Sequence, residues 1–578
     1  MASPVIRLTV PFLILSLCMS QTKLQQKFEN RRVEIVSAPP KVELLAYTGK
    51  PFDIAMATAR TCYAPELIYA KDITPGQRER IGASIYEAGH HTPFQHPTFI
   101  FGLQNISRHV VWSFFHSHPF YNSEQQSQRY VVMDNAAVFV PPLEGEALKL
   151  YESAVIKSWT AYNKISQLLV GDNFSLMEKI GKLKGQNEKS IMTDSEKKAI
   201  ENARYVLPLG AFTTMYHTIS GIVLKRYVRM ARLSDCPTEA KMIVDMMVEE
   251  VRKIDPDFIE RIGDEAFEEG DLLEEKMYEE LVLRTGSQEK LYEMNAAFAE
   301  SFDAELGDKW SKLVMFDPRA EQVVADSVRE VVGATPTMLS DDAAIDYAVN
   351  PMKNKYLNDT LNSWDMSPVM RALNHAQYTF KKRMTHTGDS QEQRHRTTPG
   401  SRPLLRMMHT RAPDYMTPPV FEKNEEARKV YDEVIAEMWK TKNTLIEMGV
   451  PAEFACYILP NAVTLRFTQS GSLLHFMHKW RLRSCFLAQL EIYNCAVDEL
   501  MQVRDVHPRL GKYLGPPCLT RYQGGVGHVK PERMKEIMTS DALDKSLQLA
   551  TTEGPCPEGP RWCGINVWMN FPKTKRPF

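Results

Sequence analysis

The sequence lacks an excess of charge of one sign, is poor in cysteine and has no long hydrophobic run. Its 70 Lys and Arg residues and 72 Asp and Glu residues give a formal net charge of −2, which excludes a broadly basic nucleic-acid-binding protein. Nine cysteines among 578 residues are too few for a disulfide scaffold and favour a reducing compartment. No apolar run approaches the roughly 20 residues of a membrane span. We therefore expect a cytoplasmic protein that binds neither nucleic acid nor membrane.

The composition that is present, 43% hydrophobic and 25% charged, is typical of a globular protein with a large core. Residues 1–38 differ from the rest and are predicted to be an N-terminal extension. Within them, Arg7 precedes the apolar residues 8–19, which have the length of a signal-peptide core. A cleavable signal, or an extension from a start codon assigned too early, would each explain this segment.

Two regions of the chain carry the same motifs in the same order. Tyr151 and Trp159 are eight residues apart, as are Tyr431 and Trp439, and each pair follows two consecutive prolines. Segments of the form Ala-x-Tyr-x-Leu-Pro follow each pair. Such internal repetition indicates two diverged copies of one domain, and the mixed periodicities predict an α+β fold. The predicted organisation is copy one at 39–263, an acidic helical linker or insertion at 264–319, copy two at 320–505, and a cysteine-containing C-terminal segment at 506–578.

Four segments contain residues suited to chemistry. The polar run 120–130, with Ser127 and Arg129, suits a phosphate group but could also be a solvated loop. The run 391–396 places two arginines around a histidine, which suits an anionic ligand or a basic surface. Three histidines at 89–96 could ligate a metal, although Pro93 breaks any helix that would align them. Residues 480–492 are predicted to begin an amphipathic helix, on which Gln489 and Glu491 point to different faces.

Taken together, these segments resemble the motifs of the flavin-dependent thymidylate synthase family. The matching motifs are G-H-x-T-P-F-x-H at 89–96, S-x-R-Y at 127–130, A-R-x-x-L-P at 203–208, Q-x-x-R-H-R at 391–396 and L-R…A-Q-x-E-I at 482–492. The resemblance covers roughly residues 40–260 and 320–505. It implies a mixed or antiparallel sheet with long helices in each copy. It also implies methylation of dUMP to dTMP with FAD as cofactor and with methylenetetrahydrofolate and NADPH as co-substrates.

The resemblance assigns roles residue by residue. Arg483 and Arg204 are the candidate catalytic residues, which orient or polarise the nucleotide. The candidate substrate-binding residues are Ser127, Gln128, Arg129, Gln125 and Gln391. The candidate cofactor-binding residues are Arg394, His395, Arg396, His90, Thr92, Gln95, His478 and Gln489.

Each copy departs from the family pattern, and the departures are complementary. Copy one has His116-Ser-His118 at the position of the R-H-R element, and copy two has Cys456 at the position of Arg204. The S-x-R-Y loop of copy two is predicted to be shortened or lost. Because the family builds its site from several subunits of a homotetramer, we expect one composite site from two incomplete copies. The expected assembly is a homodimer that acts as a pseudo-tetramer.

Two alternative functions and one candidate metal site accompany the prediction of a flavin-dependent enzyme. The eroded motifs are compatible with a non-catalytic nucleotide-binding or scaffold protein of the same fold. Residues 514–523, which contain Cys518, resemble the Pro-Cys nucleophile segment of the classical, flavin-free thymidylate synthases, so a thiolate mechanism is a second possibility. We expect no metal, but Cys518, His528, Cys556 and Cys563 are candidate ligands for a structural zinc ion.

Overall fold

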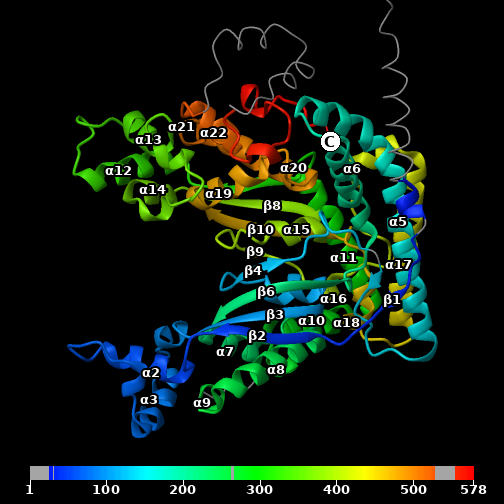
Figure 1. The fold of residues 1–578 in the computed structure, drawn as a ribbon, viewed down its shortest axis with the longest axis horizontal. Coiled ribbons are helices and arrows are strands. Elements are labelled where there is room, and N and C mark those ends of the chain that lie inside the picture. Colours follow the sequence, from blue (N-terminus) through cyan, green and yellow to red (C-terminus); the bar gives the residue numbers. More distant parts are fainter. Residues whose placement is uncertain (1–24, 30, 134, 262–265, 527–553, 578) are drawn as a thin grey trace, which may run out of the picture.

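The computed structural model describes residues 25–29, 31–133, 135–261, 266–526 and 554–577 (Figure 1). The apolar run 8–19 and His528 lie outside these ranges. The chain forms two four-stranded antiparallel sheets with many helices around them, which confirms the predicted combination of sheet and helix. Within the described ranges, no helix combines the length and the apolar character needed to cross a membrane.

Copy one contains the sheet β2-β3-β6-β4, in that spatial order. Its strands are β2 (Lys41–Tyr47), β3 (Thr98–Ser107), β4 (Asn122–Gln125) and β6 (Phe212–Ser220). Along most of β3, buried residues alternate with less buried ones, as expected for a strand with one face on a core. Asn105 interrupts this alternation with φ 55°, where the pairing with β6 shifts register between Leu103 and Ile106.

Copy two contains the sheet β7-β8-β10-β9. Its strands are β7 (Ser311–Phe316), β8 (Gln377–Thr385), β9 (Gly400–Ser401) and β10 (Thr464–Ser472). The two sheets lie one above the other in Figure 1, with β4 and β9 between their central strands. Because β7 pairs with β8, the second sheet begins at Ser311, within the segment predicted to be a linker.

Equivalent helices follow equivalent strands in the two copies. Helix α5 (Gly145–Leu183) packs against α17 (Glu425–Glu447), and these carry the two Tyr and Trp pairs. The extra residues of copy one lengthen α5 and add α6 (Glu188–Ala203), which packs against it. Helices α7 (Gly221–Met230) and α8 (Pro237–Ile254) correspond to α19 (Leu473–Arg483) and α20 (Leu490–Val506).

The remaining elements extend or cover these two units. The segment between the copies contains α10 (Leu273–Thr285) and α11 (Gln288–Leu306), as the pattern predicted. The further helices are α2 (Pro51–Thr61), α3 (Pro75–Glu87), α4 (Arg108–Val110), α9 (Pro256–Glu260), α12 (Ala320–Val332), α13 (Asp341–Val349), α14 (Pro368–Arg371), α15 (His386–Glu392), α16 (Leu405–Met408), α18 (Ala452–Ala455), α21 (Pro508–Gly511) and α22 (Pro517–Gln523), and a two-stranded sheet joins β1 (Ile35–Val36) to β5 (Ala136–Ala137).

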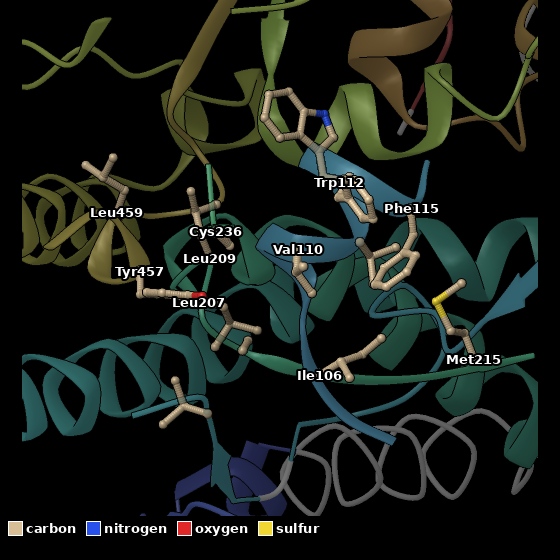
Figure 2. Close-up of a cluster of buried hydrophobic side chains, with 14 of the residues drawn as sticks. Ile106, Val110, Trp112, Phe115, Leu207, Leu209, Met215, Cys236, Tyr457 and Leu459 are labelled. Atoms are coloured by element: carbon tan, nitrogen blue, oxygen red, sulfur yellow. The ribbon is translucent and has the colours of Figure 1, made fainter. Parts of the chain in front are cut away.

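The two copies meet along their Leu-Pro segments. The Leu209 amide donates to the Leu459 carbonyl at 2.8 Å, and the Asn461 amide donates to the Leu207 carbonyl at 2.8 Å. These bonds are related by one offset of 252 residues, so the two segments pair as equivalents about a pseudo-twofold axis. Figure 2 shows Leu207, Leu209, Leu459 and Tyr457 together with Trp112 in the buried cluster around this contact. One hydrophobic core therefore includes residues of both copies.

Two buried glutamates repeat this symmetry. Glu239 of copy one accepts hydrogen bonds from the amide and hydroxyl of Ser107 and, at 2.7 Å, from the hydroxyl of Tyr457 in copy two. Glu491 of copy two accepts the same set from Thr385 and, at 2.8 Å, from Tyr205 of copy one. Each copy thus satisfies a buried carboxyl group of the other, as a buried polar group requires.

Candidate active site

Arg129 of copy one lies in a turn after β4 and reaches into copy two. Its guanidinium donates two bonds to Glu201, at 2.9 and 2.8 Å, and one to the carbonyl of Leu487 at 2.7 Å. A longer bond of 3.4 Å joins it to the side chain of Gln391. Although burial opposes it, the carboxylate of Glu201 raises the pKa of Arg129. Arg129 is therefore a fixed cation at the contact between the copies.

The neighbouring residues predicted to bind substrate shape this turn. The Ser127 hydroxyl accepts a bond from the Arg129 amide at 3.2 Å, and the Ser127 carbonyl accepts from Val131 at 3.0 Å. Gln128 is buried and its side-chain oxygen accepts from Asn461 of copy two at 3.2 Å. Gln125 lies in β4, paired with Met215. Among these residues Ser127 bonds the backbone of Arg129, Gln128 contacts copy two, and Gln125 belongs to the sheet edge.

Arg204 begins the turn η4 (Arg204–Val206) that follows α6. Its guanidinium donates to the side-chain oxygen of Gln489, which also accepts from Gln391. The amide of Gln489 donates to the hydroxyl of Tyr205. Burial, with the charge of Arg129, lowers the pKa of Arg204 to about 10. The candidate residues of both copies thus form one continuous hydrogen-bonded network.

Gln489 and Glu491 lie differently from the prediction. Residues 480–492 do not begin one helix, because α19 ends at Arg483 and α20 begins at Leu490. Gln489 precedes α20 in an extended conformation, so the helical spacing does not apply to it. As a result, Gln489 and Glu491 both bond the hydroxyl of Tyr205, and the expectation that they face different sides is wrong.

Arg483 ends α19 and binds the R-H-R segment. It donates to the imidazole of His395 at 2.8 Å and to the carbonyl of Gln391 at 3.0 Å. Burial, with the charge of Arg483, holds the pKa of His395 well below its usual value, so this ring is neutral. His478 lies beside it, with ring centroids 5.7 Å apart. His395 therefore faces Arg483, and His478, which is half-buried, packs on His395.

Arg394 and Arg396 point the other way, into a cleft of about 350 Å³ between the copies. The opposite wall consists of residues from β4, β6 and the preceding loop: Tyr121, Asn122, Ser123, Glu124, Tyr216 and Thr218. Arg396 lies over the ring of Tyr121 at 5.2 Å and donates to Asn122 at 3.1 Å. A cleft of this size, with two guanidinium groups and two aromatic rings, can hold an anionic aromatic ligand.

The His116-Ser-His118 segment of copy one supports the wall of the same cleft. His116 stacks on Tyr121, with centroids 4.6 Å apart, and bonds the Ser123 hydroxyl at 2.6 Å. Burial, together with nearby arginines, lowers the pKa of His116 to about 3 and that of His118 to about 4. His116 and His118 are thus the equivalents in copy one of Arg394 and Arg396, and both are neutral. The two histidines pack within the wall of the cleft, whereas the two arginines face the cleft itself.

Helix α15, which leads into the R-H-R segment, is anchored from both copies. The Trp112 indole donates to Asp389 at 2.8 Å, and Arg402 donates to the same carboxylate at 2.5 and 2.9 Å. Glu392, which is fully buried, accepts from Lys382 at 2.9 Å and from Lys479 at 2.7 Å. These contacts fix the helix before Arg394.

The S-x-R loop of copy two is neither lost nor much shortened, contrary to expectation. Arg406 precedes Pro418 by 12 residues, as Arg129 precedes Pro141 (418 − 406 = 141 − 129 = 12). Arg406 donates to the carbonyl of Ser234 at 2.9 Å and pairs with Glu275 of α10. The arginine is thus retained, with Leu404 at the position of Ser127, and its partner carboxylate comes from the segment between the copies. The equal spacing to the proline pairs was the signal available in the sequence.

Several predicted residues lie away from the network. Thr92 and Gln95 begin and end the turn η2 (Thr92–Gln95), which starts two residues after His90 and packs on α2 and α7 of copy one. Cys518, Cys556 and Cys563 belong to a separate hydrophobic cluster around α22 and have free thiols. Among the residues that the structure describes, no group of three or more His, Cys, Asp or Glu side chains is arranged to hold a metal ion.

Cys518 is poorly suited to act as a nucleophile. Its side chain is buried, and this burial raises the pKa of the thiol well above the usual value. A nucleophilic cysteine needs the opposite, a lowered pKa. Cys518 is the second residue of α22, but the effect of its burial on the pKa is larger than that of the backbone amide of Leu519. The burial of Cys518 therefore disfavours the thiolate that this mechanism requires.

Sequence and structure comparisons complete this description. The model of the family described as thymidylate synthase complementing protein matches residues 43–257 and 312–509. The flavin-dependent thymidylate synthase of Clostridium tetani is 28% identical over 228 residues, which are 39% of this chain and 86% of that protein. The Saccharolobus solfataricus protein of the same name is 26% identical over 262 residues, 44% of this chain and 95% of that protein.

Among solved structures, a UMP/dUMP methylase from Streptomyces cacaoi bound with 5-Br dUMP matches 39% of this chain and 95% of its own, with 20% identity and a TM-score of 0.27. Two separate matches to one family model agree with the internal repeat, and each relative aligns with about as much of the chain as one copy contains.

Proposed function

The chain belongs to the family described as thymidylate synthase complementing protein, and from this premise we propose that it is a flavin-dependent thymidylate synthase. It converts dUMP to dTMP, with methylenetetrahydrofolate and NADPH as co-substrates, at one composite site. The observation that carries this proposal is the contact between complementary motif residues. Arg129 and Arg204 of copy one join Gln391 and Gln489 of copy two in one network.

In this proposal the turn around Arg129 binds the phosphate of dUMP. The positive charge of Arg129 and the hydroxyl of Ser127 suit a phosphate group. Because Nε and Nη2 of Arg129 already bond Glu201 and Leu487, Nη1, whose bond to Gln391 is 3.4 Å long, is the donor left for the phosphate. Arg129 is held by Glu201 and by the Leu487 carbonyl. Its side chain therefore loses little conformational entropy when a phosphate binds. Such preorganisation favours both affinity and a fixed position of the uracil ring.

Arg204 and Arg483 act on the uracil ring. During methylation a carbon of the uracil ring acts as the nucleophile. Negative charge then develops on a carbonyl oxygen of the same ring. Buried cations that are already in place stabilise such charge most effectively. Gln489 and Gln391 hold Arg204 and Arg483 respectively, through the bonds described above.

The cleft beside Arg394 and Arg396 fits a flavin nucleotide. The two guanidinium groups suit its phosphates, and Tyr121 and Tyr216 offer ring faces for its aromatic systems. When bound, FAD would receive a hydride from NADPH and pass it on to the reaction. The chain's own contribution is to fix the cleft through Trp112 and Asp389. With one such site in each chain, a homodimer has two sites among four copies.

The test combines a spectrum with an activity assay. Purified protein mixed with FAD and freed of excess cofactor should show flavin absorbance in the visible, and it should form dTMP from dUMP. The double variant Arg394→Ala/Arg396→Ala should lose the absorbance, whereas Arg319→Ala, an exposed arginine far along the chain, should keep it. Protein that binds dUMP but neither takes up FAD nor forms dTMP would support the non-catalytic alternative.

A further inference from the structure

One face of strands β4 and β6 brings an aromatic ring and a carboxylate together in the cleft. Glu124 and Tyr216 are directly opposite each other in the antiparallel pairing of these strands, and opposite residues point to the same face of a sheet. Both line the cleft of about 350 Å³ that also contains Arg394 and Arg396. An aromatic ring, a carboxylate and two guanidinium groups therefore share one cleft between the copies.

Tyr216 is the ring that is available for stacking. It is 61% exposed although β6 lies inside the sheet, between β3 and β4. Among the residues that the structure describes, no ring or cation packs on it, whereas Tyr121 already stacks on His116 and lies under Arg396. An exposed aromatic side chain beside two cations is suited to stack on a planar group of an anionic ligand.

Glu124 restricts which planar group this is. Its side chain is exposed and accepts from Arg394, at 3.3 Å to each oxygen, so some of its lone pairs remain free. An ionised carboxylate only accepts hydrogen bonds. The polar edge of an isoalloxazine ring consists mostly of acceptor atoms, which this carboxylate would repel, whereas the ribose hydroxyls and the amino group of an adenosine donate. Glu124 therefore favours the adenosine end of a dinucleotide over the flavin end.

The charges and the size of the cleft agree with this choice. Arg394 and Arg396 suit the pyrophosphate that adjoins an adenosine. A volume of about 350 Å³ lies at the lower end of the range of ligand pockets, roughly 300–1,000 Å³, and so suits one half of a dinucleotide better than the whole. A carboxylate that accepts from the ribose 2′-hydroxyl also opposes a 2′-phosphate, which distinguishes FAD from NADPH.

We propose that the cleft binds the adenosine diphosphate half of FAD, with Tyr216 stacked on the adenine and Glu124 bound to the ribose hydroxyls. This inference rests on the proposed function and adds to it two residues that belong to none of the motifs that carry the family resemblance. Copy two has Thr468 at the position of Tyr216, by the same offset of 252 residues that relates the Leu-Pro segments. The adenosine site is therefore expected once per chain, on copy one.

The experiment measures displacement of FAD from the full-length protein, followed by flavin fluorescence. ADP should displace FAD, and 2′-phospho-ADP should bind more weakly by roughly tenfold or more, because like charges would meet at Glu124. Tyr216→Ala should weaken FAD binding by about tenfold, within the range for one base stacked on an aromatic side chain, and leave the binding of FMN, which has no adenosine, unchanged. The matched control is Tyr63→Ala, which removes another exposed ring and should bind FAD like wild type.

A second variant tests the carboxylate. Glu124→Gln also releases Arg394, which strengthens the binding of any phosphate. The ratio of the ADP affinity to the 2′-phospho-ADP affinity is therefore the informative quantity, because the release of Arg394 affects both nucleotides alike. This ratio should fall severalfold in Glu124→Gln. In the control Glu43→Gln, which changes an exposed carboxylate of β2, the ratio should stay at the wild-type value.

Several results would refute this inference while the proposed function stands. If Tyr216→Ala binds FAD as tightly as Tyr63→Ala does, the ring contacts no part of the cofactor. If it weakens FAD and FMN binding equally, the ring contacts the flavin half. If ADP and 2′-phospho-ADP displace FAD equally well, Glu124 does not face the ribose.

Wild-type protein that takes up no FAD refutes the proposed function instead. Calorimetric titration with ADP then tests the cleft by itself. An ADP affinity that Tyr216→Ala lowers supports the adenosine site, and an affinity that is the same in wild type and Tyr216→Ala refutes it as well.

Discussion

The exchanged tyrosines offer a matched pair of substitutions for testing whether the two halves have different functions. Tyr205→Phe removes the hydroxyl that bonds Glu491 and Gln489, and Tyr457→Phe removes the hydroxyl that bonds Glu239. Both tyrosines are buried and both serve a glutamate of the other copy. The change in chemistry is therefore the same on the two sides of the pseudo-twofold axis.

The two substitutions should cost similar stability. In each variant the glutamate keeps its two bonds, from Ser107 to Glu239 or from Thr385 to Glu491. Each glutamate loses one buried bond, which is worth about 1–3 kcal/mol when a partner is left unsatisfied. Each variant also loses a second contact of the hydroxyl, with Gln489 for Tyr205 and with Cys236 for Tyr457. Only Tyr205, however, holds Gln489, which in turn holds Arg204. We expect Tyr205→Phe alone to reduce dTMP formation, by about tenfold if 1.4 kcal/mol of positioning is lost.

Thermal melting and steady-state assays with dUMP measure the two effects separately. The expected result is a similar fall in melting temperature for both variants, with lower activity for Tyr205→Phe alone. If Tyr457→Phe lost as much activity as Tyr205→Phe, the Glu239 half would also contribute to turnover. The assignment of one composite site per chain would then be wrong.

Three further predictions follow from the site. Arg204→Ala and Arg483→Ala should each abolish most dTMP formation in a folded protein, because both act at one site; much activity left in either variant would show that each copy works alone. Cys518→Ala should retain turnover, with some loss of melting temperature, whereas a folded but inactive variant would revive the thiolate mechanism. Burial raises the pKa of Glu239 from 4.5 to about 7, so the folded protein holds this proton more tightly and stability falls as the pH rises from about 4.5 to about 7, by roughly 3 kcal/mol for this group. Glu239→Gln should flatten that part of a plot of melting temperature against pH, and an unchanged plot would mean that Glu239 is already ionised in the fold.

Much of the site could be predicted from motifs, because short segments with fixed spacing are visible in a sequence. The two Tyr and Trp pairs and the Leu-Pro segments identified the repeat, and the structure places them as equivalents. The contact between Arg129 and Gln391 spans 262 residues. The complementary losses suggested a shared site, but no spacing rule could give this pairing.

Other features depended on tertiary contacts. Glu201 and Tyr205 flank Arg204 in sequence, but their importance comes from Arg129 and Glu491, which pair with them across the chain. The break between α19 and α20 was missed because the apolar pattern continues through residues 484–489, although the chain is extended at Gln489. Arg406 was missed because the S-x-R-Y motif was sought by residue type alone. In copy two Leu404 replaces the serine of that motif, so the motif is not recognisable there.

The peptide connection between the two copies also affects how the site responds to dilution. When two half-sites belong to separate chains, lowering the protein concentration separates them. Here the two halves of the proposed site are tethered, with an effective local concentration that is set by the intervening segment and is independent of the protein concentration in solution. The paired Leu-Pro segments then close as an intramolecular contact. The network between Arg129 and Gln391 should therefore persist at concentrations at which an equivalent pair of free subunits would come apart.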